Sequence, residues 1–141
     1  MSETIERTYP ITEGPTPILP SLGIDMVEVD RISKHLRDDH FLNRIFTENE
    51  RYECEGRAKP EECFAARWAA KEAMAKALGT GIGKYLNFKD VEVINIPGKG
   101  PCIRMHGHFA QFPMLTKLSL THTRTTGAAV VMVFPGSDDE R

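Results

Sequence analysis

The sequence predicts a single folded domain that contains both helices and strands, with one long helix near its centre. Residues 60–78 are rich in alanine and carry no helix breaker after their first position, which is typical of a long helix. Short apolar or alternating runs lie before and after this stretch, as expected of strands. A composition of 40% hydrophobic and 27% charged residues in 141 is that of one soluble globular domain.

The two ends of the chain have a different character from its middle. Residues 1–20 contain four prolines among polar residues with little periodicity, so we expect a flexible arm there. The stretch after Pro135 is polar. The sequence therefore predicts an N-terminal arm over residues 1–20, one domain over residues 21–134 and a polar tail over residues 135–141.

The first part of the domain begins with a strand over Leu22–Val29, an apolar and β-branched run that contains Asp25. Asp30 is a candidate N-cap for a helix that runs from Arg31 into the mid-forties. Thr47, followed three residues later by Glu50, matches a capping box and predicts the start of another helix.

The second part is built around the long helix over residues 60–78, which has acids in its first turn and Gly79 just past its end. A glycine-rich turn follows it, and residues 91–105 are predicted to form a hairpin. Residues 117–122 alternate between polar and apolar side chains, and the chain turns at Gly127 into the apolar run over residues 128–134.

Charge and cysteine content exclude several classes of protein. The net charge of −2 argues against a nucleic-acid partner, because phosphate backbones select basic surfaces. Cys54, Cys63 and Cys102 are odd in number and have no CxxC spacing, so we expect reduced thiols and a cytoplasmic protein. No apolar run approaches the roughly 20 residues that span a bilayer, so no membrane segment is expected.

Two carboxylates stand out as candidate site residues. Asp25 lies in an apolar strand, where its charge is costly unless a cation meets it, although it could also cap a turn or face solvent. Glu72 falls between Ala65, Trp68 and Lys76 on the long helix, where it could bind a metal or form an ordinary ion pair with Lys76. Two carboxylates without a His or Cys cluster suit Mg²⁺.

Basic residues near these carboxylates could bind phosphate groups. Arg67, Lys71 and Lys76 share the long helix, although solvated side chains would give the same pattern. The GTGIGK turn that follows is neither a Walker A motif nor a dinucleotide fingerprint, because it comes after a helix rather than a strand. His122 is expected to face inward on its strand, either as a core histidine or as a phosphate contact.

Another group of basic residues lies on the first predicted helix. Arg31, Lys34 and His35 share one helix face, which could dock an acidic helix of a partner or simply be solvated. His106 and His108 flank a glycine in a predicted loop and have no third ligand nearby, so we interpret them as surface residues.

Three segments stand out in this order: Gly23–Ile32 (GIDMVEVDRI), Phe64–Gly83 (FAARWAAKEAMAKALGTGIG) and Leu118–Thr123 (LSLTHT). Together they resemble the signatures of the holo-acyl-carrier-protein synthases, a family of 4'-phosphopantetheinyl transferases. The resemblance extends over residues 22–134, and its long middle block is highly specific. The sequence departs from the family pattern at residues 97–101 and in the short stretch over residues 106–115.

The resemblance implies an α+β fold, with a long central helix packed on an antiparallel sheet, and a homotrimer that binds coenzyme A between neighbouring subunits. It implies that Asp25 and Glu72 bind Mg²⁺, that Lys76 assists them in catalysis, and that Arg31 meets acidic residues on the acyl carrier protein. The residues that it implies in coenzyme A binding are Arg67, Lys71, Lys76, Gly79, Gly81, His122 and Thr123.

The implied reaction transfers 4'-phosphopantetheine from coenzyme A to a serine of an apo acyl carrier protein and releases adenosine 3',5'-bisphosphate. Glu72, directly or through a metal-bound water, is the candidate acceptor of the serine proton. The alternative is a catalytically silent module that binds coenzyme A or a nucleotide and regulates a partner. Such a module would need the phosphate contacts but neither Asp25 nor Glu72.

Overall fold

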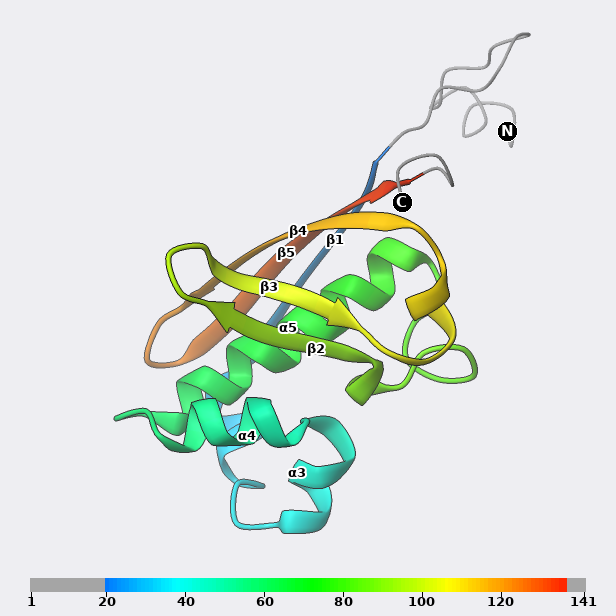
Figure 1. The fold of residues 1–141 in the computed structure, drawn as a ribbon. Coiled ribbons are helices and arrows are strands. Elements are labelled where there is room, and N and C mark those ends of the chain that lie inside the picture. Colours follow the sequence, from blue (N-terminus) through cyan, green and yellow to red (C-terminus); the bar gives the residue numbers. More distant parts are fainter. Residues whose placement is uncertain (1–19, 137–141) are drawn as a thin grey trace, which may run out of the picture.

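A computed structural model describes residues 20–136 and contains five strands, four α-helices and two short 3₁₀ helices in that range (Figure 1). Most of the predicted N-terminal arm and C-terminal tail lies outside the described residues. The elements, in chain order, are β1 (Ser21–Glu28), α2 (Val29–Ser33), α3 (Asp39–Ile45), α4 (Glu48–Glu55), α5 (Pro60–Leu78), η1 (Phe88–Asp90), β2 (Val91–Ile96), β3 (Gly100–Met105), η2 (Gly107–Gln111), β4 (Met114–His122) and β5 (Thr126–Pro135).

The strands form two antiparallel sheets. One has three strands in the order β1-β5-β4, and the other is the hairpin β2-β3. Figure 1 shows α5 running along the three-stranded sheet, with the hairpin beside it and the short helices α3 and α4 at one end. This arrangement confirms the α+β fold in which a long central helix packs on an antiparallel sheet. Among residues 20–136, no helix is both long and apolar enough to cross a membrane.

Two glycines let α5 lie close to the sheet. A Cβ atom on Gly23 of β1 would lie 1.8 Å from the carbonyl oxygen of Ala73, and one on Gly127 of β5 would lie 2.9 Å from the carbonyl carbon of Ala65. The alanines of α5 that face the sheet are buried. Glycines of the strands meet alanines of α5, so the backbones of the sheet and the helix lie close together. The carboxylate of a neighbouring strand residue can therefore reach the side chains of α5.

The ends of α5 agree with the sequence prediction. Pro60 occupies the first turn, where its missing N–H costs nothing, and two glutamates follow it. Gly79 ends the helix in the left-handed conformation with a φ of 79°. The N–H groups of Thr80 and Gly81 both donate to the carbonyl oxygen of Ala75, so the glycine-rich turn closes the last turn of the helix.

The single helix predicted from Arg31 into the mid-forties is wrong, because the structure has two helices there. The short α2 begins at Val29, so Asp30 lies inside it and does not act as its N-cap. Asp38 caps α3 instead, since its carboxylate accepts hydrogen bonds from the N–H groups of His40 and Phe41. A side chain that caps a new helix competes with continuation of the old one, which explains the break.

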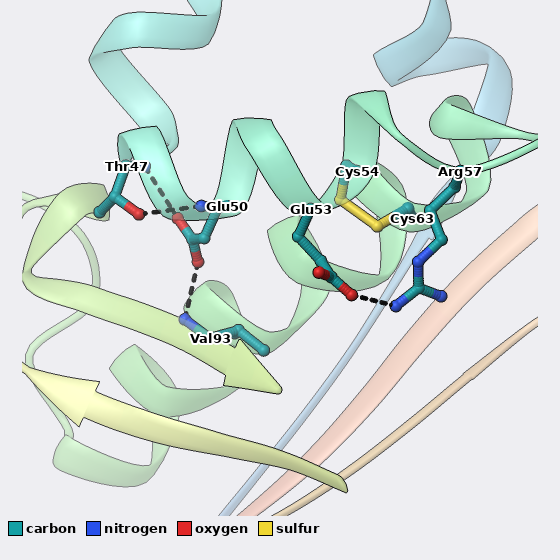
Figure 2. Close-up of a disulfide and its surroundings, with 7 residues drawn as sticks. All are labelled: Thr47, Glu50, Glu53, Cys54, Arg57, Cys63 and Val93. Carbon is teal, nitrogen blue, oxygen red and sulfur yellow. Dashed lines mark hydrogen bonds and ion pairs between the residues drawn. A yellow bond between two sulfur atoms is a disulfide. The ribbon is translucent and has the colours of Figure 1, made fainter. Parts of the chain in front are cut away.

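The capping box at the start of α4 is confirmed, and its glutamate has a further role. The Thr47 hydroxyl accepts from the Glu50 N–H, and Glu50 Oε1 accepts from the Thr47 N–H (Figure 2). Glu50 Oε2 also accepts from the N–H of Val93 at 2.7 Å. One buried carboxylate therefore joins α4 to the hairpin.

The expectation of three reduced cysteines is wrong, because Cys54 and Cys63 form a disulfide between the end of α4 and the start of α5 (Figure 2). Their Cα atoms are 5.4 Å apart, and both residues are buried. Cys102 is outside this bond. A spacing of nine residues gives no sign that α4 turns back onto α5, so the sequence could not reveal this pair.

Candidate functional site

The first candidate cluster lies between β1 and the second half of α5. Along β1, Gly23, Asp25 and Val27 are less exposed than the residues between them, and α5 covers this side of the strand. The Nζ atom of Lys76 is 3.1 Å from Asp25 Oδ1 and 3.0 Å from the carbonyl oxygen of Ile24. A cation from α5 therefore compensates the strand carboxylate, and Asp25 does not cap a turn.

Glu72 is the second carboxylate of this cluster, and it lacks the simple ion pair considered from the sequence. Lys76 pairs with Asp25, and no Glu72–Lys76 pair within 4.0 Å occurs in the described part of the chain. Burial raises the pKa of Glu72, and the charge of Asp25 raises it further, while Lys76 and Arg31 oppose both effects. Two carboxylates thus compete for one lysine, which is an arrangement that an additional cation would stabilise.

The donor set of this cluster fits a hard cation better than zinc. It consists of carboxylate oxygens from Asp25 and Glu72, and no group of three His, Cys, Asp or Glu residues suited to a metal occurs within residues 20–136. Mg²⁺ is commonly bound by one or two carboxylates together with water and substrate phosphates. The two residues therefore fit Mg²⁺, provided that water and a substrate complete its ligands.

Arg31 lies beside this cluster, on the exposed surface of α2. Its guanidinium is 5.8 Å above the ring of Trp68, which is one helical turn before Glu72. Burial raises the pKa of Glu72, and the charge of Arg31 opposes this rise. Trp68 packs in turn against the rings of Phe41 and Phe88. An aromatic platform therefore holds Arg31 at the rim of the carboxylate pair.

The second candidate cluster lines a cavity of about 500 Å³ at the first half of α5. Arg67 is 5% exposed, and its Nε atom has no hydrogen-bond partner among residues 20–136. Burial lowers the pKa of Arg67, and the positive charge of Arg57 lowers it further. A buried guanidinium with an unused donor suits an anionic ligand. The cavity is lined by Arg57, Ala58, Lys59, Glu62, Cys63, Ala66, Arg67, Asn95, Pro101, Leu120 and His122.

His122 belongs to this cavity and is not a core histidine. It ends β4 opposite Gly127, and 49% of its side chain is exposed. Its Nδ1 atom lies 2.8 Å from Oε1 of Glu62, a buried residue in the first turn of α5. The sequence analysis missed Glu62, because 60 positions separate it from His122 and only the packing of β4 beside α5 brings them together.

Three further predicted contacts lie in turns. The hydroxyl of Thr123 accepts hydrogen bonds from the N–H groups of Thr125 and Thr126 and so shapes the β4–β5 turn. Gly79 and Gly81 have φ values of 79° and 66°, and the space next to each is open. Their N–H groups already donate to carbonyl oxygens at the end of α5, so these two amides do not form a phosphate cradle.

Lys71 is not in either cluster, which contradicts its predicted role as a phosphate contact. Its side chain is fully buried, and its Nζ atom donates to Glu50 Oε1 at 2.7 Å and to the carbonyl oxygens of Phe88 and Val91. Burial lowers the pKa of Lys71, while the charge of Glu50 opposes this effect. All three donors of the ammonium are used inside the protein, so Lys71 is a structural residue.

The two clusters occupy different sides of α5. Arg67 and Glu72 are five positions apart, which rotates their directions by about 140° on a helix. Within one chain, the structure brings Asp25, Glu72 and Lys76 together at one place, and Arg67 and His122 at another.

A family model described as the 4'-phosphopantetheinyl transferase superfamily matches residues 21–131 of this sequence. The chain belongs to this superfamily. The match covers both clusters, since it runs from the start of β1 into β5. The resemblance seen in the sequence is confirmed.

Curated members of this superfamily provide closer comparisons. The sequence is 54% identical over 74 residues to a holo-[acyl-carrier-protein] synthase of Chlamydia trachomatis, an alignment that covers 51% of this chain and 62% of the relative. The chain thus matches less than two thirds of that relative's length. It is 40% identical over 118 residues to the holo-[acyl-carrier-protein] synthase of Chlamydia felis, covering 79% of this chain and 96% of the relative.

Solved structures of the superfamily share the fold. A holo-(acyl-carrier-protein) synthase from Bacillus anthracis, in complex with CoA (3',5'-ADP), matches with a TM-score of 0.71 and 38% identity over 82% of this chain and 96% of that one. The Helicobacter pylori synthase in complex with coenzyme A matches with a TM-score of 0.70 and 32% identity, covering 79% and 98% of the two chains.

Proposed function

We propose that this protein transfers the 4'-phosphopantetheine group of coenzyme A to a serine of an apo acyl carrier protein and releases adenosine 3',5'-bisphosphate. We place the reaction in the cytoplasm, although the Cys54–Cys63 disulfide removes the argument from reduced cysteines on which that prediction was based. The observation that carries the proposal is the cluster in which Lys76 pairs with Asp25 while Glu72, with a raised pKa, lies beside them. Membership of the superfamily and the structural likeness to synthases bound to coenzyme A support it.

Asp25 and Glu72 would hold Mg²⁺ in this proposal. Burial and the charge of Asp25 both raise the pKa of Glu72, so a divalent cation held by the two carboxylates would relieve an unfavourable interaction. When bound, Mg²⁺ neutralises charge on the diphosphate of coenzyme A.

Lys76 and Glu72 contribute separately to the transfer step. The side chain of Lys76 is 55% exposed, so its ammonium can move from Asp25 to a phosphate oxygen and stabilise the developing charge. Glu72 is the carboxylate of this cluster that does not pair with Lys76, so it is available to accept a proton directly or through water. We therefore assign to Glu72 the acceptance of the serine proton.

The second cluster is the proposed site for the remaining phosphates of coenzyme A. Arg67 has an unused buried donor in the cavity, and His122 lines the same space. Thr123 belongs to the turn beside His122, whereas Gly79 and Gly81 lie next to open space beyond α5. Because Arg67 and Glu72 point to different sides of one helix, we propose that one coenzyme A bridges the clusters of two neighbouring subunits.

The outer face of the three-stranded sheet supports such an assembly. On β1, the side chains of Leu22, Ile24 and Met26 are 60%, 62% and 67% exposed. Val130 and Met132 of β5 pair with Ile24 and Leu22, so the apolar surface continues onto the next strand. Contiguous exposed apolar surface of this kind marks a protein interface. We propose that it is buried in a homotrimer.

The carrier protein is proposed to dock at Arg31. This residue is exposed, is held above Trp68 and lies close enough to Glu72 to affect its pKa. An acidic helix that meets Arg31 would therefore bring its serine toward the carboxylate pair.

Mass spectrometry of the carrier protein tests the proposed function. The purified protein is incubated with apo carrier protein, coenzyme A and Mg²⁺, and the carrier should gain the mass of one phosphopantetheine. Parallel reactions contain a chelator, or Glu72→Gln protein, and neither should modify the carrier. A folded wild-type protein that binds coenzyme A yet leaves several carrier proteins unmodified would instead support the silent regulatory module.

A further inference from the structure

A buried carboxylate lies in the wall of the cation-rich cavity, where it is unfavourable for an anionic ligand. Glu62 has a side chain that is only 10% exposed, and it shares the cavity with Arg57, Lys59 and Arg67. Its Oε2 atom has no hydrogen-bond partner among residues 20–136, and the closest ammonium, that of Lys59, is 3.8 Å away. A charge that is buried with so little compensation requires a specific reason.

The contact with His122 supplies such a reason. Glu62 Oε1 lies 2.8 Å from Nδ1 of His122, the distance of an ion pair between a carboxylate and a protonated imidazole. This contact restrains an imidazole that is otherwise half exposed. It also leaves Nε2 available for a ligand in the cavity that His122 lines. A carboxylate that orients a histidine through its second nitrogen is a common arrangement at metal and catalytic sites.

We propose that Glu62 is a positioning residue for the nucleotide part of coenzyme A, acting through His122. Glu62 pairs with Nδ1 when the ring carries both protons, and the Nε2–H group of that form donates to a phosphate oxygen. Arg67, which lines the same cavity, donates to phosphate through its unused Nε–H group. This inference rests on the proposed function, because it takes the cavity to be the phosphate site of that reaction.

A purely structural role for Glu62 makes different predictions. The residue lies in the first turn of α5, where any acid interacts favourably with the helix dipole, and it is 3.8 Å from Lys59. In that case its removal would lower stability without affecting what His122 does. Glu61 is the matched control, because it is the other acid in the same first turn.

Calorimetric titration with adenosine 3',5'-bisphosphate separates the two roles. Glu62→Gln should weaken binding about tenfold, the scale of a hydrogen bond to a charged group, and His122→Gln should weaken it at least as much. The double variant should bind no more weakly than His122→Gln alone, because Glu62 acts through that ring. Glu61→Gln should bind as the wild type does. Equal affinities of wild type and Glu62→Gln, or additive losses in the double variant, would overturn the inference.

Two further measurements remain informative if Glu62→Gln folds poorly. Glu62→Asp keeps the charge but withdraws the carboxylate from Nδ1 by one methylene, so it should also weaken binding of the bisphosphate. The ¹⁵N spectrum of the imidazole should show a protonated Nδ1 in the wild type and an altered ring signal in Glu62→Asp. A ring signal unchanged by this substitution would remove Glu62 from its positioning role.

Kinetics distinguish failure of this inference from failure of the proposed function. In a transferring enzyme, Glu62→Gln should raise the KM for coenzyme A about tenfold and leave the KM for carrier protein unchanged. If Glu62→Gln transfers the group as the wild type does and has a normal KM for coenzyme A, the inference is overturned and the proposed function stands. If no transfer occurs but bisphosphate binding depends on Glu62 through His122, the proposed function is overturned and the inference stands. A wild type that does not bind the bisphosphate would overturn the inference.

Discussion

Asp25 and Glu72 show how two neighbouring carboxylates acquire different properties from their surroundings. Asp25 comes from a strand and meets Lys76 at 3.1 Å, whereas Glu72 is partly desolvated and has no partner within 4.0 Å in the described structure. The sequence could identify both residues as anomalies, because each places a charge in an apolar pattern. It could not show which of them the lysine meets, since that depends on how β1 lies across α5.

The raised pKa of Glu72 predicts a distinct pH dependence of stability. A carboxyl group with a higher pKa in the folded state binds its proton more tightly there than in the unfolded state, so stability falls as pH rises from the ordinary glutamate range through the raised value. Glu72→Gln should lack this fall and be more stable than the wild type at neutral pH. Urea denaturation in the presence of a chelator, at several pH values, measures both profiles.

The matched variant in this experiment is Asp25→Asn, which loses the ion pair with Lys76 and should not gain stability. In the transfer assay, both substitutions should lower turnover by roughly a hundredfold or more, the scale of lost acid–base or charge stabilisation. Parallel pH profiles of the wild type and Glu72→Gln would contradict the assignment of this raised pKa.

Lys71 illustrates a sequence prediction that helical geometry alone could not test. Lys71 follows Arg67 by four positions, so both point to nearly the same side of the helix, and only the packing shows that Lys71 is fully buried beside Glu50. We expect Lys71→Met to cost about 3–5 kcal/mol of unfolding free energy, because it leaves the buried Glu50 carboxylate uncompensated. The exposed counterpart Lys76→Met should cost under about 1 kcal/mol. A small loss for Lys71→Met in urea denaturation would show that Glu50 is accommodated without its lysine.

At the scale of elements, local patterns predicted what depends on local physics. The bounds of α5, the Thr47 capping box and the hairpin followed from caps, glycines and periodicity. The break between α2 and α3 was missed because Asp38 caps a new helix within a stretch that has helical spacing. The disulfide was missed because it depends on the return of α4 onto α5, which no local pattern encodes.

The disulfide closes the loop that connects α4 to α5, and this loop supplies Arg57 and Lys59 to the cavity. Figure 2 shows the ion pair between Arg57 and Glu53 next to the disulfide. Replacing Cys54 and Cys63 together with alanine should lower the free energy of unfolding by about 2–3 kcal/mol, the cost in chain entropy for a loop of this length. Cys102→Ala is the control and should retain the bond.

Urea denaturation without reductant measures the stability loss, and alkylation of the unfolded protein followed by mass spectrometry counts the thiols. One alkylated cysteine per wild-type chain is expected, because Cys54 and Cys63 are joined. Three alkylated cysteines under non-reducing conditions would contradict the disulfide.

At the scale of the whole molecule, the three-stranded sheet has one face covered by α5 and one face with exposed apolar side chains. An apolar run such as Leu22–Val29 predicts a strand but is equally typical of one buried on both sides. Only the structure shows that Leu22, Ile24 and Met26 lie on the side away from the helix. The same structure separates the two polar clusters around α5, and the proposal that a second subunit completes the site rests on this separation.

If the exposed face forms the trimer, Ile24→Asp should convert the protein to folded monomers, because a charge in an apolar interface is costly to desolvate. Light scattering measures the assembly, and circular dichroism confirms that the monomer is folded. The control is Tyr52→Asp, which alters a side chain that is 85% exposed on α4 and should leave the trimer intact. A wild-type protein that is an active monomer would contradict the assembly.

A shared site also predicts that two inactive variants restore activity to each other. Arg67→Ala removes the buried cation of one cluster, and Glu72→Gln removes the carboxylate of the other. In a mixed trimer, an interface that joins an intact Arg67 cluster from one subunit to an intact Glu72 cluster from its neighbour has all its groups. Mixing the two chains under conditions of subunit exchange should therefore recover a fraction of the wild-type transfer rate. The mixture should remain inactive when each chain also carries Ile24→Asp, because monomers cannot combine their clusters. Absence of recovery in the mixed trimers would place both clusters in one active site within a single chain.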